Sequence, residues 1–305
     1  MMSMFIGAGI QIFFVAVCTL MYSLYDLYFD KGALLGIATG IFPWFGFING
    51  YTAARFYTFF NGSSWTKLAC YTSMFLPSLI SNCCCVIDFC EWIETGRMDS
   101  YPIREATVLS YYWFFIHMPS AFAGSYIGFI RKPIEPPVKK NRMVREIEDG
   151  TECPNWVEIP MIGIMAAFLP TMVLMLQLWQ IMGNVNGAAN IHAMHSMFYV
   201  VFALFLIVVI ESALLLNYTT LTSDQPNWWW RVWWGSSLIG VYVFIIMAFY
   251  LIYDLRVEYF TTLISYFTAC YLVSCLIGLM CSSLAMIFTF RFNLKIYSKV
   301  KDLNQ

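Results

Sequence analysis

Eight long apolar stretches constrain the fold of this 305-residue chain more than any other feature. Each is about 20 residues long, the length of helix that crosses roughly 30 Å of hydrocarbon. Their approximate limits are 5–25, 33–54, 68–90, 107–130, 157–182, 194–216, 232–253 and 260–290. The stretches are continuously apolar and do not alternate with polar residues, so they predict helices and exclude a β-barrel. We therefore expect an all-α fold, a polytopic membrane bundle of about eight transmembrane helices, forming one membrane domain over residues 1–305.

Composition and charge agree with this fold class. The chain is 60% hydrophobic and only 11% charged, whereas soluble domains are about 45–50% apolar and 25% charged. If both termini and every second loop are cytosolic, 13 of the 17 basic residues lie on the cytosolic side and 4 on the other. This asymmetry is the one that the positive-inside rule describes. The charge pattern gives no reason to expect a nucleic-acid partner.

A run of tryptophans, PNWWWRVWWG at 226–235, stands at the predicted cytosolic entry of the seventh span. Indole rings are favourable at the headgroup level, where the ring is in the apolar boundary and the N–H is wet. Arg231 can reach anionic lipids of the cytosolic leaflet or stack on an indole face. We interpret the run as an interface anchor, with a binding surface for another membrane helix as the alternative. The anchor residues are Trp228, Trp229, Trp230, Arg231, Trp233 and Trp234.

Glycines recur at intervals of four in two regions of the chain. Spacing by four places small residues on one helix face, which allows another helix to approach closely. One interpretation is packing among the chain's own spans, and the other is a groove that accepts helices of other membrane proteins. The residues concerned are Gly32, Gly36, Gly40, Gly46, Gly50, Gly124 and Gly128.

One carboxylate interrupts an apolar span, Glu211 within FALFLIVVIESALLL. A carboxylate at the centre of a membrane helix costs about 2.5–3.5 kcal/mol and normally faces the protein interior. Gln177 and Gln180 of the preceding span are plausible hydrogen-bond partners. The structural interpretation is a buried interhelical hydrogen bond, and the functional one is a proton or cation site.

Prolines also interrupt the spans, at positions 43, 77, 119 and 170. Proline removes a backbone donor and clashes with the preceding turn, so we expect kinked or broken helices. Broken helices at membrane depth build substrate sites in transporters. A secondary transporter that uses these helices and Glu211 is therefore the alternative function.

Other chemistry has little support. His192 and His195 are three residues apart on a predicted helix, but two histidines make an incomplete metal site. The ten cysteines show no paired C-x-x-C spacing. No phosphate-binding glycine loop, H-E-x-x-H or nucleophile motif is present. We therefore expect no cofactor, no metal and no enzymatic activity, although a membrane enzyme stays open as a further alternative.

Several segments resemble the nonaspanins, the nine-transmembrane superfamily. They include NWWWR at 227–231, GAGIQ at 7–11, GYTAARFY at 50–57, FLP at 75–77 and 168–170, GSYIGFIRKPIEPPV at 124–138 and KIYSKVK at 295–301. The resemblance covers nearly the whole chain. In that family a luminal domain and a first span precede this region, so the chain corresponds to the family's membrane domain from the second span onward.

The resemblance implies a function in sorting or escorting membrane proteins with glycine-rich spans, at Golgi and endosome membranes, with the endoplasmic reticulum or cell surface as further locations. Anionic lipids at the cytosolic face are expected as additional partners. Family members end in a lysine and acidic signal that the vesicle coat binds, and the residues after Lys301 do not match it, so coat binding is not supported. The candidates for cytosolic docking are Arg131, Lys132, Pro133, Glu135, Lys295, Lys299 and Lys301.

Overall fold

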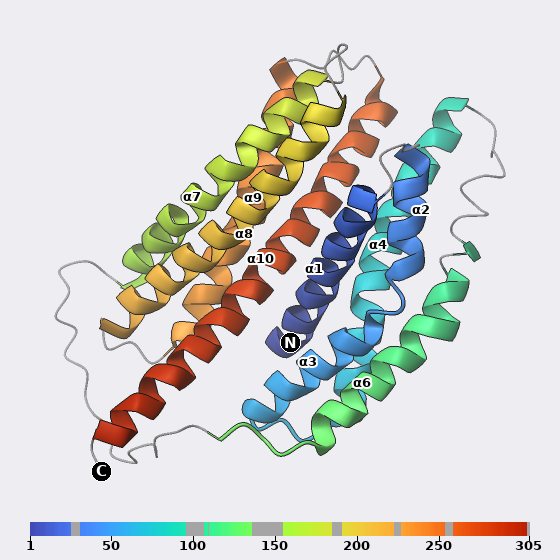
Figure 1. Ribbon diagram of the computed structural model, residues 1–305. Helices are drawn as coiled ribbons and strands as arrows, with labels where there is room; N and C mark the ends of the chain where they lie inside the picture. Colours follow the sequence, from blue (N-terminus) through green and yellow to red (C-terminus); the bar gives the residue numbers. More distant parts are fainter. Residues whose placement is uncertain are drawn as a thin grey trace. The chain divides into compact units, whose positions relative to one another are not determined.

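The computed structural model describes residues 1–25, 31–95, 107–108, 110–135, 155–184, 191–222, 227–253 and 259–303. The regular elements in these ranges are all helical (Figure 1). They are α1 (Met2–Tyr25), α2 (Lys31–Ile41), α3 (Gly46–Phe59), α4 (Trp65–Thr95), the π-helical turn η1 (Trp113–His117), α6 (Met118–Ile130), α7 (Asn155–Asn184), α8 (Ile191–Thr222), α9 (Trp228–Tyr253) and α10 (Phe260–Leu303).

Six of the described helices are long and apolar enough to cross a membrane. These spans are Met2–Ser23, Trp65–Glu94, Met161–Leu178, Phe198–Thr222, Trp228–Tyr253 and Phe260–Lys299. The helical membrane bundle predicted from hydropathy is confirmed, but the count of eight is not. The two remaining apolar stretches, 33–54 and 107–130, differ from continuous α-helices, and a proline lies at each irregularity.

The stretch 33–54 forms two helices because α2 ends at Ile41 and α3 begins at Gly46. Pro43 lies in the turn between them and cannot donate a backbone hydrogen bond. The turn is closed by short-range bonds, from Trp44 N–H to the Ile41 carbonyl at 3.1 Å and from Gly46 N–H to the Pro43 carbonyl at 3.2 Å. The expected break is therefore present at Pro43.

The second irregularity is the π-helical turn η1, which leads directly into α6 with Pro119 in the first turn. Pro119 lacks a backbone N–H, and it follows the π-turn directly, where the wider helix accommodates the missing donor. A π-turn widens the helix locally and re-aims the side chains within it, and such turns are frequent at functional sites. Pro77 and Pro170, in contrast, lie inside the continuous helices α4 and α7.

The described residues divide into two compact units, each built around its own helix contacts. The first comprises residues 1–133 with 240–280, and its most extensive contact is between α3 and α6. Figure 1 shows these two helices side by side, with α1 and α4 also against α3. Glycines make the close approach possible: a methyl group at Gly124 would collide with the Phe47 carbonyl, and one at Gly50 with the Ala121 carbonyl.

The same helix pair is tied together where both helices end. The guanidinium of Arg55 on α3 donates to the Lys132 carbonyl at 2.6 Å and to the Arg131 carbonyl at 3.4 Å. These carbonyls follow the last turn of α6, where a cation is favourable because of the helix dipole.

At the end of α3, Asn61 has a φ of 58° and Gly62 N–H donates to the Tyr57 carbonyl at 2.9 Å. This is a left-handed helix termination of the Schellman type.

The second unit comprises the described residues of 134–239 and 281–305. It contains α7, α8, the first half of α9 and the second half of α10. Two buried amides join α8 to α10: Asn217 Nδ2 donates to Asn293 Oδ1 at 2.8 Å, and Asn293 Nδ2 donates to Asn217 Oδ1 at 3.2 Å. Each amide therefore satisfies the other inside an otherwise apolar interface.

The glycine contacts predict a position-dependent effect of added bulk. Gly124→Val should lower the free energy of unfolding by about 1–3 kcal/mol or more, because overpacking a tight contact forces backbone shifts. Gly36→Val is the matched control, since no atom lies within 4 Å of a Cβ there. Thermal unfolding of both variants in detergent or nanodiscs measures the difference. Equal losses of stability would contradict the described packing of α3 on α6.

The amide pair predicts a non-additive result in a double-mutant cycle. Asn293→Leu should destabilise the protein by about 1–2 kcal/mol, because it leaves the Asn217 amide buried without its partner. The double variant Asn217→Leu/Asn293→Leu should be more stable than the sum of the two single changes implies. Strict additivity of the three measured stabilities would show that the two amides do not interact.

Candidate functional site

The candidate site is a cluster of buried polar side chains in the first unit. Gln11 of α1, Asn49 of α3 and His117 of η1 have no exposed surface at all. They come from three separate helices, and the turn between α2 and α3 passes beside them. Polar side chains inside a membrane protein are costly and mark functional sites more often than other residues do. We call these three residues the polar cluster.

Gln11 is the centre of the cluster, and the contacts determine how its amide is oriented. Gln11 Nε2 donates to the Phe42 carbonyl at 2.9 Å, and Asn49 Nδ2 donates to Gln11 Oε1 at 2.9 Å. A carbonyl oxygen can only accept, so the nitrogen of Gln11 must face Phe42. The same nitrogen lies 3.4 Å from His117 Nδ1. That ring nitrogen accepts from Gln11 in the tautomer that carries its proton on Nε2, and the Pro43 carbonyl beside the ring is an acceptor for the other tautomer.

The broken helix depends on these side chains. The Phe42 carbonyl lies at the interruption between α2 and α3, and the neighbouring Pro43 carbonyl accepts from Ser120 Oγ at 3.2 Å. In a membrane, freed backbone groups must find partners within the protein because lipid offers none. Gln11 provides the partner of the Phe42 carbonyl, and Ser120 adds a second donor to the Pro43 carbonyl, which also accepts from Gly46 N–H. The polar cluster thus stabilises the end of α2.

The His117 ring is tightly enclosed. It stacks on Phe42, with ring centroids 5.4 Å apart and planes inclined by 15°. A Cβ at Gly46 would be 2.7 Å from Nδ1, so only glycine leaves room for the ring. His117 Nε2 is buried without a hydrogen-bond partner among the described residues. A buried unsatisfied nitrogen is uncommon in proteins and asks for a functional explanation.

The cluster also explains the segment GAGIQ at 7–11. Gly7 packs against Asn49, and a Cβ there would be 2.5 Å from both the backbone oxygen and Oδ1 of Asn49. Gln11, four residues later on the same helix face, reaches the Asn49 amide and the Phe42 carbonyl. Both residues therefore serve the same site, which motif reading alone did not reveal.

The predicted glycine residues separate into two groups. Gly46, Gly50, Gly124 and Gly128 form the close contact of α3 with η1 and α6. Gly36 and Gly40 of α2, in contrast, have no atom within 4 Å of an added Cβ. Gly32 is in the first turn of α2, and its surroundings lie outside the described side chains. The structure therefore assigns internal packing to one group and leaves part of the α2 face open.

Glu211 does not lie where we expected it. Its side chain is exposed on α8, whereas Gln177 of α7 is buried and neither of its amide atoms has a hydrogen-bond partner among the described residues. The structure does not bring these two side chains together. The side chain of Gln180 and those of His192 and His195 lie outside the described residues. Among the residues that are described, no group of three or more His, Cys, Asp or Glu could hold a metal ion.

The tryptophan run opens α9, as the sequence pattern places it. Trp230 and Trp234 are 45% and 58% exposed, but Trp233 is buried and packs edge-to-face with both of them. Trp228 and Trp229 are half-buried, as is Arg231. One of the predicted anchors is thus part of the core of its unit.

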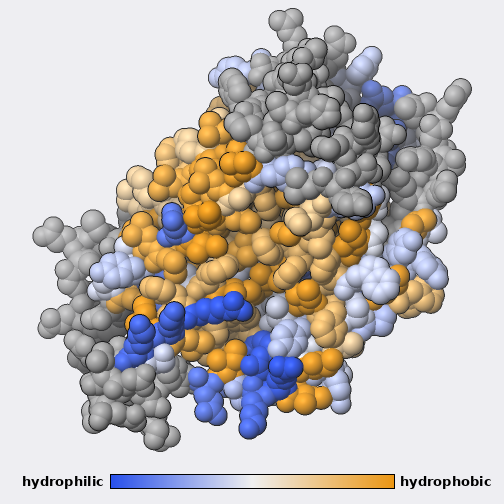
Figure 2. Space-filling view, viewed as in Figure 1, coloured by the Kyte–Doolittle hydropathy of each residue, from blue (hydrophilic) through white to orange (hydrophobic). Residues whose placement is uncertain are grey.

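The charged docking candidates lie on the surface of their units. Arg131, Lys132, Pro133 and Glu135 are exposed, as are Lys295 and Lys299 on α10. The side chain of Lys301 lies outside the described residues. Figure 2 shows that hydrophilic side chains occupy small areas of a largely hydrophobic surface.

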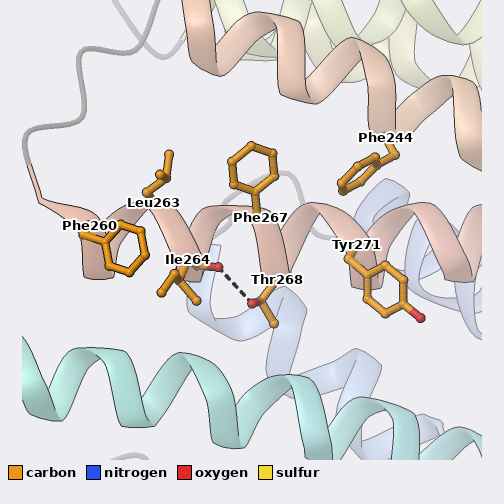
Figure 3. Close-up of a pocket in the computed structure, with 7 residues that line it drawn as sticks. All are labelled: Phe244, Phe260, Leu263, Ile264, Phe267, Thr268 and Tyr271. Atoms are coloured by element: carbon orange, nitrogen blue, oxygen red, sulfur yellow. Dashed lines mark hydrogen bonds between the residues drawn. The ribbon is translucent and has the colours of Figure 1, made fainter.

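An apolar groove lies between α9 and α10 in the first unit, with a volume of about 480 Å³. Figure 3 shows Phe244 of α9 opposite the ring of Phe267. Thr268 turns its hydroxyl back to its own helix and donates to the Ile264 carbonyl at 2.8 Å. The groove therefore offers mainly carbon surface. Its lining residues are Phe244, Phe260, Leu263, Ile264, Phe267, Thr268 and Tyr271.

Comparison with known proteins identifies the family. The sequence model of Endomembrane protein 70 matches residues 1–260. The chain belongs to the endomembrane protein 70 family. It is 29% identical to human "Transmembrane 9 superfamily member 2" over 307 residues, which cover 99% of this chain and 45% of that protein. No solved structure matches the chain.

More distant members of the family give the same picture. The chain is 24% identical to "Transmembrane 9 superfamily member 9" of Arabidopsis thaliana, over 99% of this chain and 46% of that protein. It is 25% identical to "Transmembrane 9 superfamily protein C1105.08" of Schizosaccharomyces pombe, over 98% of this chain and 47% of that protein. The chain thus spans about half the length of these family members. The nonaspanin resemblance is confirmed, and the chain is an integral, multi-pass membrane protein.

The polar cluster predicts that two buried glutamines differ in their contribution to stability. Gln11→Met should lower the free energy of unfolding by about 1–3 kcal/mol, because the Phe42 carbonyl and the Asn49 amide lose their partner. Gln177→Met is the matched control and should cost less, since the Gln177 amide has no hydrogen-bond partner among the described residues. Unfolding of both variants in detergent provides the comparison. A larger loss for Gln177→Met would contradict the role given to Gln11.

Proposed function

We propose that the chain sorts or escorts other membrane proteins with glycine-rich transmembrane segments, at Golgi and endosome membranes, without catalysis. The observation that carries this proposal is the open face of α2. Gly36 and Gly40 are one helical turn apart, and an added Cβ at either would have no described atom of another residue within 4 Å. In lipid, helices associate through small residues that allow their backbones to approach closely. A glycine-rich span of another protein has the matching surface.

The contrast within the chain supports this assignment. The α3–α6 contact demonstrates how closely two helices of this protein approach when both carry glycines, since the Gly124 position lies directly against the Phe47 carbonyl. The α2 face has the same spacing but no partner helix there among the described residues. A span with small residues four apart can pack on α2 as α6 packs on α3.

The exposed basic residues supply a second contact surface. Arg131, Lys132, Lys295 and Lys299 are exposed near the ends of α6 and α10. With the orientation that the positive-inside rule gives, they face the cytosolic leaflet, where anionic lipids attract them by about 1 kcal/mol for each charge. This attraction would orient the chain in the membrane and leave the α2 face free for other proteins.

The proposal predicts that bulk on the α2 face abolishes sorting without unfolding the protein. The variant Gly36→Val/Gly40→Val should bind a reporter with a glycine-rich span about tenfold more weakly and lower the amount of that reporter at the cell surface. The control Ala203→Val also places a valine side chain at an exposed position, on α8 instead of α2. Surface abundance and co-purification of the reporter are the measurements. Normal sorting by a stable Gly36→Val/Gly40→Val protein would refute the proposal.

A secondary transporter is the second candidate, favoured by the interruption between α2 and α3 beside the polar cluster. Transporters bind substrates where broken helices meet polar groups within the membrane. Flux measured in liposomes that contain the purified protein distinguishes the two functions. Ion-coupled flux that is lost in Glu211→Gln or Gln11→Met, at equal protein content, would support transport. Wild-type sorting by Glu211→Gln would exclude an obligatory role for that charge.

A further inference from the structure

We propose that His117 is a proton-binding site that controls the end of α2: when the ring takes up a proton, it releases Gln11 and loosens the helix that carries Gly36 and Gly40. The site and its response to acid follow from the polar cluster alone. Only the consequence, that acidification weakens the binding of another protein's transmembrane helix to α2, rests on the proposed function.

The first step concerns the ring nitrogen Nδ1. Its neighbour is the Gln11 amide nitrogen at 3.4 Å, and that nitrogen also donates to the Phe42 carbonyl at 2.9 Å. A neutral imidazole can accept at Nδ1, but an imidazolium has a donor at both nitrogens. The protonated ring would therefore place its N–H against the N–H group of Gln11. The contact between Nδ1 and the Gln11 amide nitrogen is therefore a hydrogen bond only while the ring is neutral.

The second step concerns what Gln11 does when the ring is protonated. If the Gln11 amide turns, Oε1 can accept from Nδ1–H, but Nε2 then leaves the Phe42 carbonyl and meets the Asn49 amide. Asn49 Nδ2 now donates to Gln11 Oε1 at 2.9 Å and to the Thr72 carbonyl at 3.4 Å, so it would lose the shorter of its two hydrogen bonds. Asn49 Oδ1 has no hydrogen-bond partner among the described residues. If the Asn49 side-chain amide also rotates, this oxygen can accept from Gln11 Nε2. Protonation therefore reorients the side-chain amides of Gln11 and Asn49, and the Phe42 carbonyl loses Gln11 Nε2 as its donor.

The third step concerns the charged and titratable groups around the ring. Helices α1 and α6 and the turn η1 contain no Asp, Glu, Lys or Arg, and the charge on α2 is Lys31, ten residues and thus about 15 Å along the helix from Ile41. On α3 the nearest charge is Arg55, six residues and thus about 9 Å along the helix from Asn49. Helix α4 contacts the polar cluster at Thr72, whose carbonyl is 3.4 Å from Asn49 Nδ2. The nearest charged residue on α4 is Lys67, five residues and thus about 7.5 Å along the helix from Thr72. The titratable thiol and phenol groups on these helices are those of Cys18, Tyr22, Tyr25, Tyr51, Tyr57, Cys70, Tyr71, Cys83, Cys84, Cys85, Cys90 and Tyr126.

The ring's neighbours among the described residues are uncharged: the Gln11 amide, the Phe42 ring and the Pro43 carbonyl, which can accept from a ring N–H. The proton therefore has no carboxylate with which to pair inside the closed cluster. By linkage, the arrangement that excludes the proton loses population as the pH falls, and the arrangement that accepts it gains population. The direction of the effect is that neutral pH closes the contact and acid opens it.

Hydrogen–deuterium exchange of the chain in nanodiscs tests the proposal without any cargo. Peptides that cover residues 36–48 should exchange faster at about pH 5 than at about pH 7, after correction for the intrinsic effect of pH on amide exchange. Peptides that contain Asn217 serve as the internal reference and should show no such change. A wild-type protein whose corrected exchange at 36–48 is independent of pH would overturn the proposal.

Three variants assign the response to the ring. His117→Gln presents an amide that does not titrate, so the acid-induced increase should be lost. His195→Gln removes another of the chain's three histidines and should keep the wild-type response. Gln11→Leu should exchange fast at both pH values, because the Phe42 carbonyl has no donor at either. A response that persists in His117→Gln would refute the assignment.

Histidine-selective NMR of the wild-type protein provides a second measurement that does not depend on how the variants fold. The chain has three histidines, so the His117 signal can be assigned as the one that disappears in His117→Gln. Its titration midpoint should coincide with the midpoint of the exchange response, and a signal that does not titrate over the range of that response would overturn the proposal. If the proton response is present but Gly36→Val/Gly40→Val sorts normally, the proposed function fails and the proton site stands.

Discussion

The requirement that every backbone carbonyl in a membrane find a partner within the protein determines how the first unit is built. At the interruption between α2 and α3, Gln11 donates to the Phe42 carbonyl, and Ser120 donates to the Pro43 carbonyl, which also accepts from the Gly46 backbone N–H. Those donors reach the turn because α1 and α6 are close to α3, and α6 is close because glycines line its contact. The break, the polar cluster and the glycine contact are therefore parts of one arrangement.

This arrangement brings together segments that carry the likeness to the endomembrane protein 70 family. GAGIQ provides Gly7 and Gln11, GYTAARFY begins at Gly50, and GSYIGFIRKPIEPPV begins at Gly124. In the structure these segments contribute to the contacts of α1, α3 and α6. The motifs are distant in the chain, yet the α1–α3–α6 packing gives them a common structural role. On α2, next to this assembly, Gly36 and Gly40 have open surroundings within the part of the chain that the structure describes.

How much could be predicted from the sequence differs from feature to feature. Hydropathy locates the apolar stretches because crossing a membrane requires a fixed length of apolar helix. The packing of Gly46, Gly50, Gly124 and Gly128 could also be anticipated from their spacing, but the open surroundings of Gly36 could not. Spacing describes one helix face, and the structure alone tells which faces meet.

The polar cluster was missed for a physical reason. Its hydrogen bonds join residues 38 and 106 positions apart, so no local pattern contains them. The signal was available as Gln11 and Asn49, which are polar residues inside apolar spans. The same rule directed attention to Glu211, whose side chain is exposed on α8 instead of facing Gln177. Which proline interrupts a helix also depends on neighbours: Pro43 has donors beside it for the freed carbonyls, whereas Pro77 lies in an unbroken helix.

Site-specific photo-crosslinking from α2 in living cells tests the central claim most directly. A photoreactive side chain at position 36 fits without displacing neighbours, since no atom lies within 4 Å of a Cβ there. The account predicts adducts with other membrane proteins, mapped by mass spectrometry to glycine-rich spans, and fewer such adducts from position 203 on α8. Adducts from position 36 that contain only lipid, or only other parts of this chain, would contradict it.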